Sequence, residues 1–225
     1  MNTGARKVLI KNVVVSTAAA CFFVAGSIIL SFAGELETVK LAAPRIDKDH
    51  PFLEVLKNRS TRREFSTRDL SLQELSDLLW AADGINRPES GKRTAPSAMD
   101  MQEIDIYVAT AKGLYLYDAK NALLVMKITG DIREITGRQP FVKDAPVNLI
   151  YVADFSRMSR LSAEARDFYA AADTGFISEN VYLYCSSSGL ATVVRGLFDR
   201  VALEKAMRLR PDQRVILTQT VGYPG

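Results

Sequence analysis

Residues 104–118 read IDIYVATAKGLYLYD, and this stretch says more about the architecture than any other part of the chain. Ile104, Ile106 and Val108 alternate with polar or amphipathic neighbours, which is typical of a β-strand with one buried face. The run from Gly113 to Asp118 follows after a short interval and predicts a second strand that pairs with the first as a hairpin. A sheet is therefore expected within the fold.

Helices are predicted on both sides of this hairpin. Ser71-Leu72-Gln73-Glu74 resembles a capping box and opens a helix that Gly84 ends, and a long helix is expected over 163–188 with Gly189 as its C-terminal cap. Further helices are expected from about residue 51, at 131–136 and at 199–209, and further strands at 123–128, 147–152, 191–194 and 215–221. Because regular βαβ alternation is lacking, we predict an α+β fold with a central, mostly antiparallel sheet flanked by helices.

The first 33 residues have the character of a targeting segment. Arg6, Lys7 and Lys11 precede a charge-free, largely apolar run, which is typical of a secretory signal, and small residues at Ser31 and Ala33 favour cleavage after Ala33. The run is also long enough to span a bilayer, so an uncleaved anchor that touches the membrane through residues 12–33 is the alternative. We expect an exported or anchored protein, with a linker at 34–50 and one domain at 51–225.

Composition excludes several function classes. The chain has 225 residues and a formal charge of +3, and the three basic residues of the first 33 account for that excess, so the remaining body is neutral and has no electrostatic footprint for nucleic acid. The only histidine, His50, falls in the linker, and the two cysteines, Cys21 and Cys185, are far apart in the sequence, which argues against zinc, haem and a Ser-His-Asp triad. A phosphate-bearing ligand would also need a site other than a GxGxxG or P-loop motif.

Three short segments are candidates for ligand binding. Arg59-Ser60-Thr61-Arg62-Arg63 offers guanidinium groups and a hydroxyl that suit a phosphate, although a solvated charge run is the simpler interpretation. Residues 93–102 read RTAPSAMDMQ, where small side chains let backbone approach a flat ligand; alone, this is an ordinary loop. Gly189-Leu190-Ala191-Thr192, followed by Arg195-Gly196, is alone a helix cap and a turn.

The order of these segments, with Gly222-Tyr223-Pro224 near the end, resembles the nitroreductase-like flavoprotein family over residues 51–225. Within that family the chain is most similar to the branch of thiazole- and oxazole-forming peptide oxidases. That closer resemblance is carried by Leu78-Leu79-Trp80-Ala81-Ala82-Asp83-Gly84, Arg93-Thr94-Ala95-Pro96-Ser97-Ala98 and Gly113-Leu114-Tyr115-Leu116-Tyr117-Asp118. It implies FMN bound at the interface of a homodimer.

The resemblance also implies roles for individual residues. Those expected at the phosphate and the pyrimidine side of the flavin are Arg59, Ser60 and Arg62. Those expected along the ring and at its polar edge are Pro96, Ser97, Ala98 and Asp100. Those expected near its reactive side are Leu190 and Gly196, with Arg195 adding positive charge. Family members often carry Asn in place of Asp100 and an acid in place of Arg195.

The function implied is an FMN-dependent oxidoreductase that works by a ping-pong mechanism. NAD(P)H or another reduced donor would reduce the flavin, and a nitro compound, a quinone or oxygen would reoxidise it. Because the flavin performs the redox chemistry, no catalytic side chain is assigned. The alternatives are a membrane-tethered, non-catalytic flavin- or ligand-binding module, or an oxygen-using dehydrogenase-oxidase of a peptide or small molecule.

Overall fold

The structure, a computed structural model, describes residues 37–45 and 51–225. The predicted targeting segment and His50 lie outside these residues. The described residues belong to one unit, Glu35–Gly225. Within them, no helix has the length and apolar character needed to cross a membrane.

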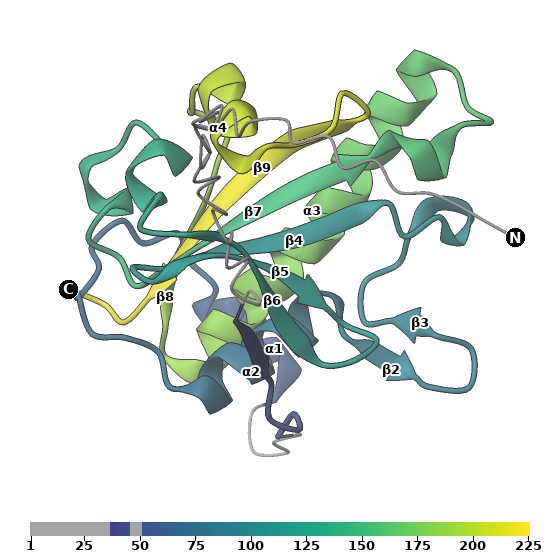
Figure 1. The fold of residues 1–225 in the computed structure, drawn as a ribbon. Helices are drawn as coiled ribbons and strands as arrows, with labels where there is room; N and C mark the ends of the chain where they lie inside the picture. Colours follow the sequence, from purple (N-terminus) through teal and green to yellow (C-terminus); the bar gives the residue numbers. More distant parts are fainter. Residues whose placement is uncertain (1–36, 46–50) are drawn as a thin grey trace, which may run out of the picture. The chain divides into compact units, whose positions relative to one another are not determined.

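Seven strands of the described chain form one sheet in the order β1-β6-β5-β4-β7-β9-β8, and every neighbouring pair is antiparallel (Figure 1). The strands are β1 (Thr38–Lys40), β4 (Ile104–Ala109), β5 (Gly113–Asp118), β6 (Leu123–Thr129), β7 (Val147–Asp154), β8 (Ala191–Arg195) and β9 (Gln213–Gly222). In the predicted hairpin Val108 pairs with Tyr115. The α+β architecture with an antiparallel sheet is therefore confirmed.

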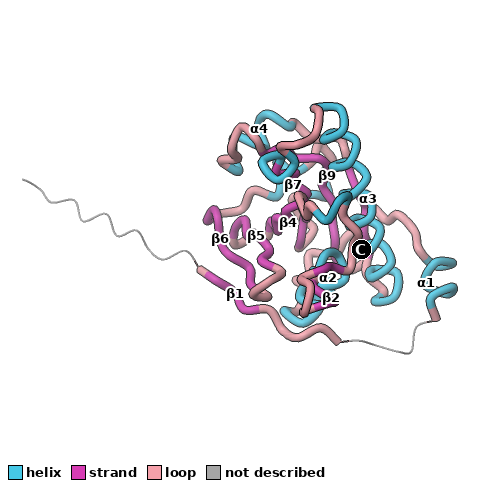
Figure 2. Tube along the Cα trace, turned by 90° about the vertical axis from the view of Figure 1, so that its right-hand side faces the viewer, coloured by secondary structure: helices cyan, strands magenta, loops and turns pink. Residues whose placement is uncertain are grey.

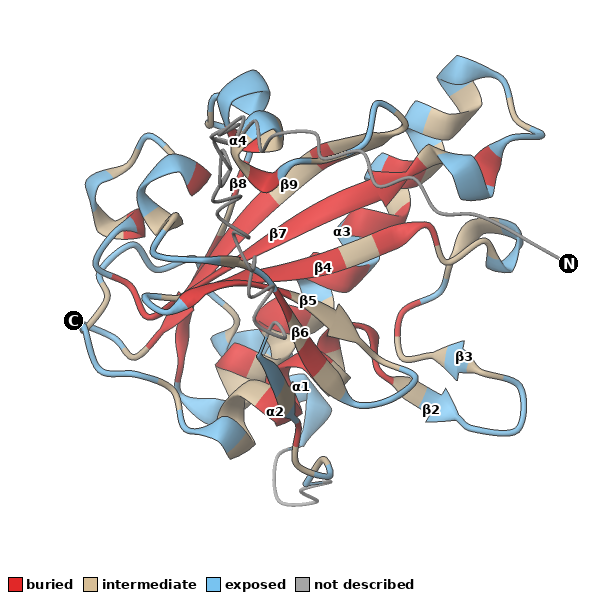
Figure 3. Ribbon diagram, viewed as in Figure 1, coloured by how far each residue is buried: buried red, intermediate tan, exposed pale blue. Residues whose placement is uncertain are grey.

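Helices cover both faces of the sheet. The helices that do so are α2 (Leu72–Asp83), α3 (Ala163–Ser188) and α4 (Arg200–Met207), whereas α1 (Phe52–Asn58) has no buried residue and lies against α3. On one face, buried residues of α2 and α3 such as Leu78 and Val181 pack with Tyr151 of β7. On the other, Leu203 of α4 packs with Ile150. Figure 2 shows α2 and α3 along one side of the strands, and Figure 3 shows that β4 and β7 are the most completely buried part of the sheet.

Local signals explain where the main helices begin and end. Ser71 and Glu74 form the predicted capping box, in which the Ser71 hydroxyl accepts from Glu74 N and the Glu74 carboxylate accepts from Ser71 N. The helix α3 ends at Gly189, whose φ of 69° is the left-handed conformation that glycine adopts without strain. Both helix boundaries therefore follow from residues that the sequence displays.

Two segments differ from expectation. The predicted linker contributes β1, in which Val39 pairs with Leu124, and the following Leu41 is buried in the core, so part of residues 34–50 belongs to the domain. The predicted polar loop at 85–95 contains a small hairpin of β2 (Ile85–Arg87) and β3 (Lys92–Arg93). Its turn uses Gly91 at a positive φ of 68°.

Candidate functional site

The arginine-rich segment after α1 is held in place by its backbone and by one tyrosine. Arg62 N donates to Thr192 O of β8 at 3.0 Å. The Tyr182 hydroxyl accepts from Val194 N at 3.0 Å and lies 3.1 Å from Thr61 Oγ1. The segment is thus fastened to the edge strand β8 and to the side of α3.

The basic side chains of this segment remain open. The Arg59 guanidinium lies over the Tyr182 ring, 5.3 Å from its centroid, while Ser60, Arg62 and Arg63 are exposed. Among the described residues, none of these three arginines forms an ion pair with an acid. One guanidinium group can donate two parallel hydrogen bonds to two oxygens of a phosphate. A fixed backbone that presents unpaired guanidinium groups and a hydroxyl therefore fits a phosphate group.

The second candidate segment forms one wall of a cavity of about 300 Å³. Pro96, Ser97 and Asp100 line this cavity, and Ala98 N donates to Asp173 Oδ2 of α3 at 2.8 Å. The Ser97 hydroxyl accepts from Gln102 N at 2.7 Å. These contacts fix the loop that the sequence predicts to lie beside a flat ligand.

The backbone of this loop is unusual. Met99, Asp100 and Gln102 all have positive φ, at 51°, 56° and 46°. Residues with side chains seldom adopt this left-handed conformation, and such strain concentrates at functional sites. The conformation turns the chain tightly between Ser97 and the start of β4, so that the loop can line the cavity.

Two buried acids that the sequence interpretation missed line the same cavity. Asp83, at the end of α2, forms a 2.8 Å ion pair with Arg93, and burial raises its pKa to about 7 despite that partner. Glu103 is completely buried, and burial together with the neighbouring Asp173 raises its pKa to about 7. The only signal for Glu103 in the sequence is a carboxylate placed directly before a buried strand.

The third candidate segment is only partly open. Gly196 is exposed immediately after β8. Leu190 is buried in the core, and its N–H donates to Cys185 O as part of the α3 cap. The N–H of Leu190 is therefore used within the chain, whereas Gly196 lies at the surface.

Arg195, at the end of β8, is buried. Its side chain is 4% exposed, and it donates to Thr136 O at 2.7 Å and to Asn148 Oδ1 at 2.8 Å. Thr192 and Arg195 are an odd number of residues apart on one strand, so their side chains point to opposite faces of the sheet. The guanidinium thus lies in the core rather than on an open surface, and the expectation that it adds charge beside a flavin stays a prediction.

The helix α3 supports both open segments. Tyr182 holds the arginine segment, and Asp173, nine residues earlier, holds the Pro96–Ala98 loop. At 1.5 Å per residue the two anchors are about 14 Å apart along the helix. The structure therefore places the arginine segment and the Pro96–Ala98 loop at two separate positions along α3.

Comparison with known proteins identifies the family of this chain. The nitroreductase family matches residues 56–223. The chain belongs to the nitroreductase family. A protein of Methanocaldococcus jannaschii named as a nitroreductase is 28% identical over 184 residues, which cover 77% of this chain and 92% of that protein. The chain is thus an enzyme of an oxidoreductase family whose members generally bind FMN.

Solved structures show the same fold. A nitroreductase from Ralstonia eutropha JMP134 is 41% identical, with a TM-score of 0.81 over 85% of this chain and 91% of that one. The NADPH:FMN oxidoreductase from Vibrio harveyi is 18% identical, with a TM-score of 0.57 over 77% of this chain and 68% of that one. The second similarity concerns the fold alone. The peptide-oxidase branch stays a prediction.

Proposed function

We propose that this protein binds FMN and transfers electrons by a ping-pong mechanism from a reduced donor to a small-molecule acceptor. One observation carries the proposal: the segment from Arg59 to Arg63 is fixed to β8 and Tyr182 while its basic side chains stay open. Such a segment binds an anion without first losing an internal partner. The phosphate of FMN is the anion that the family implies.

The two segments held by α3 then bind different parts of FMN. Arg59, Ser60 and Arg62 hold the phosphate and the pyrimidine side, and an arginine near that side stabilises negative charge on the reduced ring. The residues that lie along the ring and at its edge are Pro96, Ser97, Ala98 and Asp100, with the backbone of Gly196 near the reactive side. The bound FMN supplies two-electron redox chemistry, and the protein orients it and tunes its charge.

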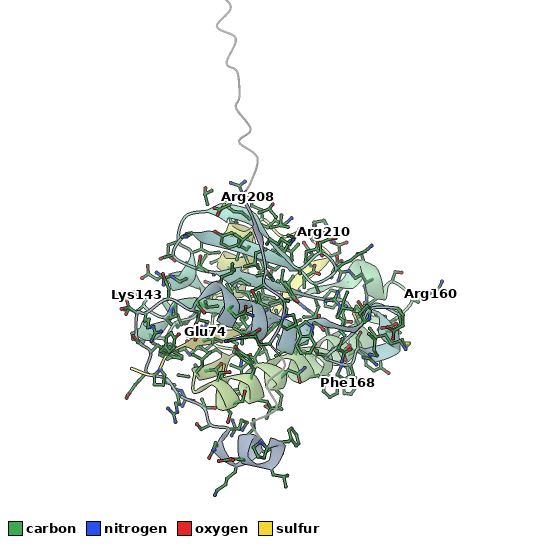
Figure 4. The ribbon with its side chains drawn as sticks, turned by 90° about the horizontal axis from the view of Figure 1, so that it is seen from below. Glu74, Lys143, Arg160, Phe168, Arg208 and Arg210 are labelled. Atoms are coloured by element: carbon green, nitrogen blue, oxygen red, sulfur yellow. The ribbon has the colours of Figure 1, made fainter. Side chains whose placement is uncertain are left out.

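A homodimer would complete the site. Asp173 and Tyr182, which hold the two segments, are about 14 Å apart along α3. The two segments of one subunit can therefore bind the same flavin or two different ones. In a dimer, the loop of one subunit can meet the arginine segment of the other. Phe168 and Phe176 of α3 and Phe52 of α1 are exposed, and large exposed apolar residues often mark subunit contacts (Figure 4 labels Phe168). Light scattering should report a dimer for the native chain, and a monomer would contradict this part of the proposal.

Which molecule can donate electrons to the flavin depends on where the protein is located. If the predicted N-terminal segment exports the domain, free NAD(P)H is not expected there, and a different donor is needed. An anaerobic screen of NADH, NADPH and reduced quinols against the bleaching of bound FMN separates these cases. Bleaching by dithionite but by none of the donors would contradict electron transfer from a small donor and favour a flavin-binding module.

Retention of FMN by variants tests the arginine segment directly. Arg59→Ala and Arg62→Ala each remove one phosphate-type donor, and the double variant should lose the flavin spectrum on gel filtration. Arg160→Ala is the matched control, because Arg160 is an exposed arginine in the stretch before α3 (Figure 4). Undiminished retention in the double variant would show that the phosphate lies elsewhere, and a colourless native protein that takes up no added FMN would refute the proposal.

A further inference from the structure

The carboxyl group of Glu103 lies at the buried end of the cavity lining, next to Ser97. Its side chain is 0% exposed, and Oε1 has no hydrogen-bond partner among the described residues. Its Oε2 lies 3.3 Å from Ser97 Oγ, which belongs to the cavity wall. An ionised carboxylate that is buried with an unpartnered oxygen lowers the stability of the fold, so burial favours the neutral, protonated acid. Such a group in a native structure calls for an explanation.

The hydroxyl of Ser97 connects this acid to the open cavity. A serine hydroxyl has one hydrogen to donate and two lone pairs that accept. One lone pair accepts from Gln102 N at 2.7 Å. The rest depends on Glu103: an ionised carboxylate can only accept, so Ser97 must donate its single hydrogen to it, whereas a protonated carboxyl can donate to the second lone pair.

We propose that Glu103 is a proton-operated positioning residue: protonated, it donates to Ser97 and frees the Ser97 hydroxyl to donate to the flavin, and ionised, it takes that hydrogen for itself. The inference rests on the proposed function, since it needs a flavin beside Pro96, Ser97 and Ala98. No covalent step is involved. Only the direction of one hydrogen bond changes.

The neighbourhood sets the pH at which the change occurs. Burial raises the pKa of Glu103 to about 7, and the adjacent carboxyl of Asp173 adds to that rise. Asp173 is itself held by Ala98 N, so it stays beside the loop. The charged groups that face Glu103 or share its cavity are Asp173 on α3, Asp83 at the end of α2, Arg87 and the pair Lys92 and Arg93 on the β2–β3 hairpin, and Asp100 in the loop.

The test measures the dissociation constant of FMN between pH 5.5 and pH 8.5 by the quenching of flavin fluorescence. In the native protein, binding should weaken roughly three- to ten-fold as pH rises through about 7, which is the loss of one hydrogen bond to the ligand. The FMN phosphate titrates near pH ~6 in every sample. The profile is therefore compared between variants and not judged from the native protein alone.

Three variants decide the outcome. In Glu103→Gln the amide can always donate to Ser97, so its affinity should match the native low-pH value and show no loss near pH 7. In Ser97→Ala the hydroxyl is absent, so the same step should vanish at a weaker affinity. In Asp173→Asn an oxygen still accepts from Ala98 N but the charge is removed, so the step should move to lower pH.

The control and the refuting results are distinct. Asp83→Asn should keep the step but move it to lower pH, because the Asp83 carboxyl faces the same cavity as Glu103 and interacts with it through charge, but does not contact Ser97 in the described structure. Equal profiles for the native protein and Glu103→Gln would overturn the inference while FMN binding stood. A step abolished by Asp83→Asn would also overturn it. Absence of FMN binding at every pH would refute the proposed function, and this inference with it.

Discussion

Gly137 is a position where one added methyl group should disturb a buried charge. A Cβ built on Gly137 would overlap Nη1 of Arg195, and it would lie 2.9 Å from Gln139 Oε1 and 3.0 Å from Val142 Cγ1. The φ of Gly137 is −173°, an extended conformation that alanine adopts freely. The substitution Gly137→Ala is thus a test of close packing alone.

The size of the effect follows from what Arg195 must give up. To make room, its guanidinium has to leave Thr136 O, and a hydrogen bond from a charged donor is worth about 1.5–3 kcal/mol. Thr136 O still accepts from Thr218 Oγ1 at 3.0 Å, so it is not left without a partner. Alanine also restricts the unfolded chain, which returns about 0.4–1 kcal/mol. We expect a net loss of about 2 kcal/mol.

Urea unfolding followed by circular dichroism measures this loss, and the thermal midpoint should fall by roughly 4–8 °C for a domain of this size. The partner variant Arg195→Ala removes the atom that the new methyl group meets. In that background Gly137→Ala should cost almost nothing, which gives a coupling energy of about 2 kcal/mol. A cost for Gly137→Ala that is equal in both backgrounds, or below about 0.5 kcal/mol in the native one, would refute the assignment of Arg195 to the core.

Three further predictions concern other buried groups. Tyr151→Phe should lower the free energy of unfolding by about 1–3 kcal/mol, because the Tyr151 hydroxyl donates to Gln219 Oε1 at 2.5 Å; an unchanged urea midpoint would contradict this. Cys185 is buried and its pKa is raised by that burial, so in a Cys21→Ser background iodoacetamide should label it only after unfolding; rapid labelling of the folded protein would be the opposite result. The pKa of Asp83 is raised to about 7, so the unfolded chain releases this proton at lower pH than the folded one, and this group's contribution to stability is lost as pH rises from about 4 to 7. Asp83→Asn should therefore lose less free energy of unfolding than the native protein between pH 5 and pH 8, and an equal loss in both would argue against the shift.

Much of the fold could be predicted because residues close in the sequence determine where its helices and strands begin and end. The hairpin of β4 and β5 follows from a period of two, and α3 ends where Gly189 permits a left-handed residue. The strand β1 escaped prediction, since three residues, half-exposed or exposed, carry too weak a pattern to be separated from a linker. Its identity as a strand depends on the edge of β6, which lies far away in the sequence.

The candidate site was less accessible to sequence reasoning. Pro96 and Ser97 were predicted from their place in a small-residue loop, and the structure puts them at a cavity, while Ala98 N donates to Asp173. The acids Glu103 and Asp173 meet only after folding brings residues 70 positions apart together, and neither has a motif of its own. The burial of Arg195 escaped prediction for another reason: the strand was expected to end at residue 194, whereas β8 includes Arg195, and the face that a strand residue occupies reverses with a single residue of offset.

The two supports on α3 have a consequence for how this protein tolerates change. Between Asp173 and Tyr182 the helix acts as a ruler, since each residue adds 1.5 Å of length and turns the next side chain by about 100°. Substitutions on its exposed surface leave the positions of Asp173 and Tyr182 unchanged. Insertion or deletion of a single residue would swing Tyr182 away from Thr61 while Asp173 stayed with Ala98, so this stretch should accept many side chains but only one length.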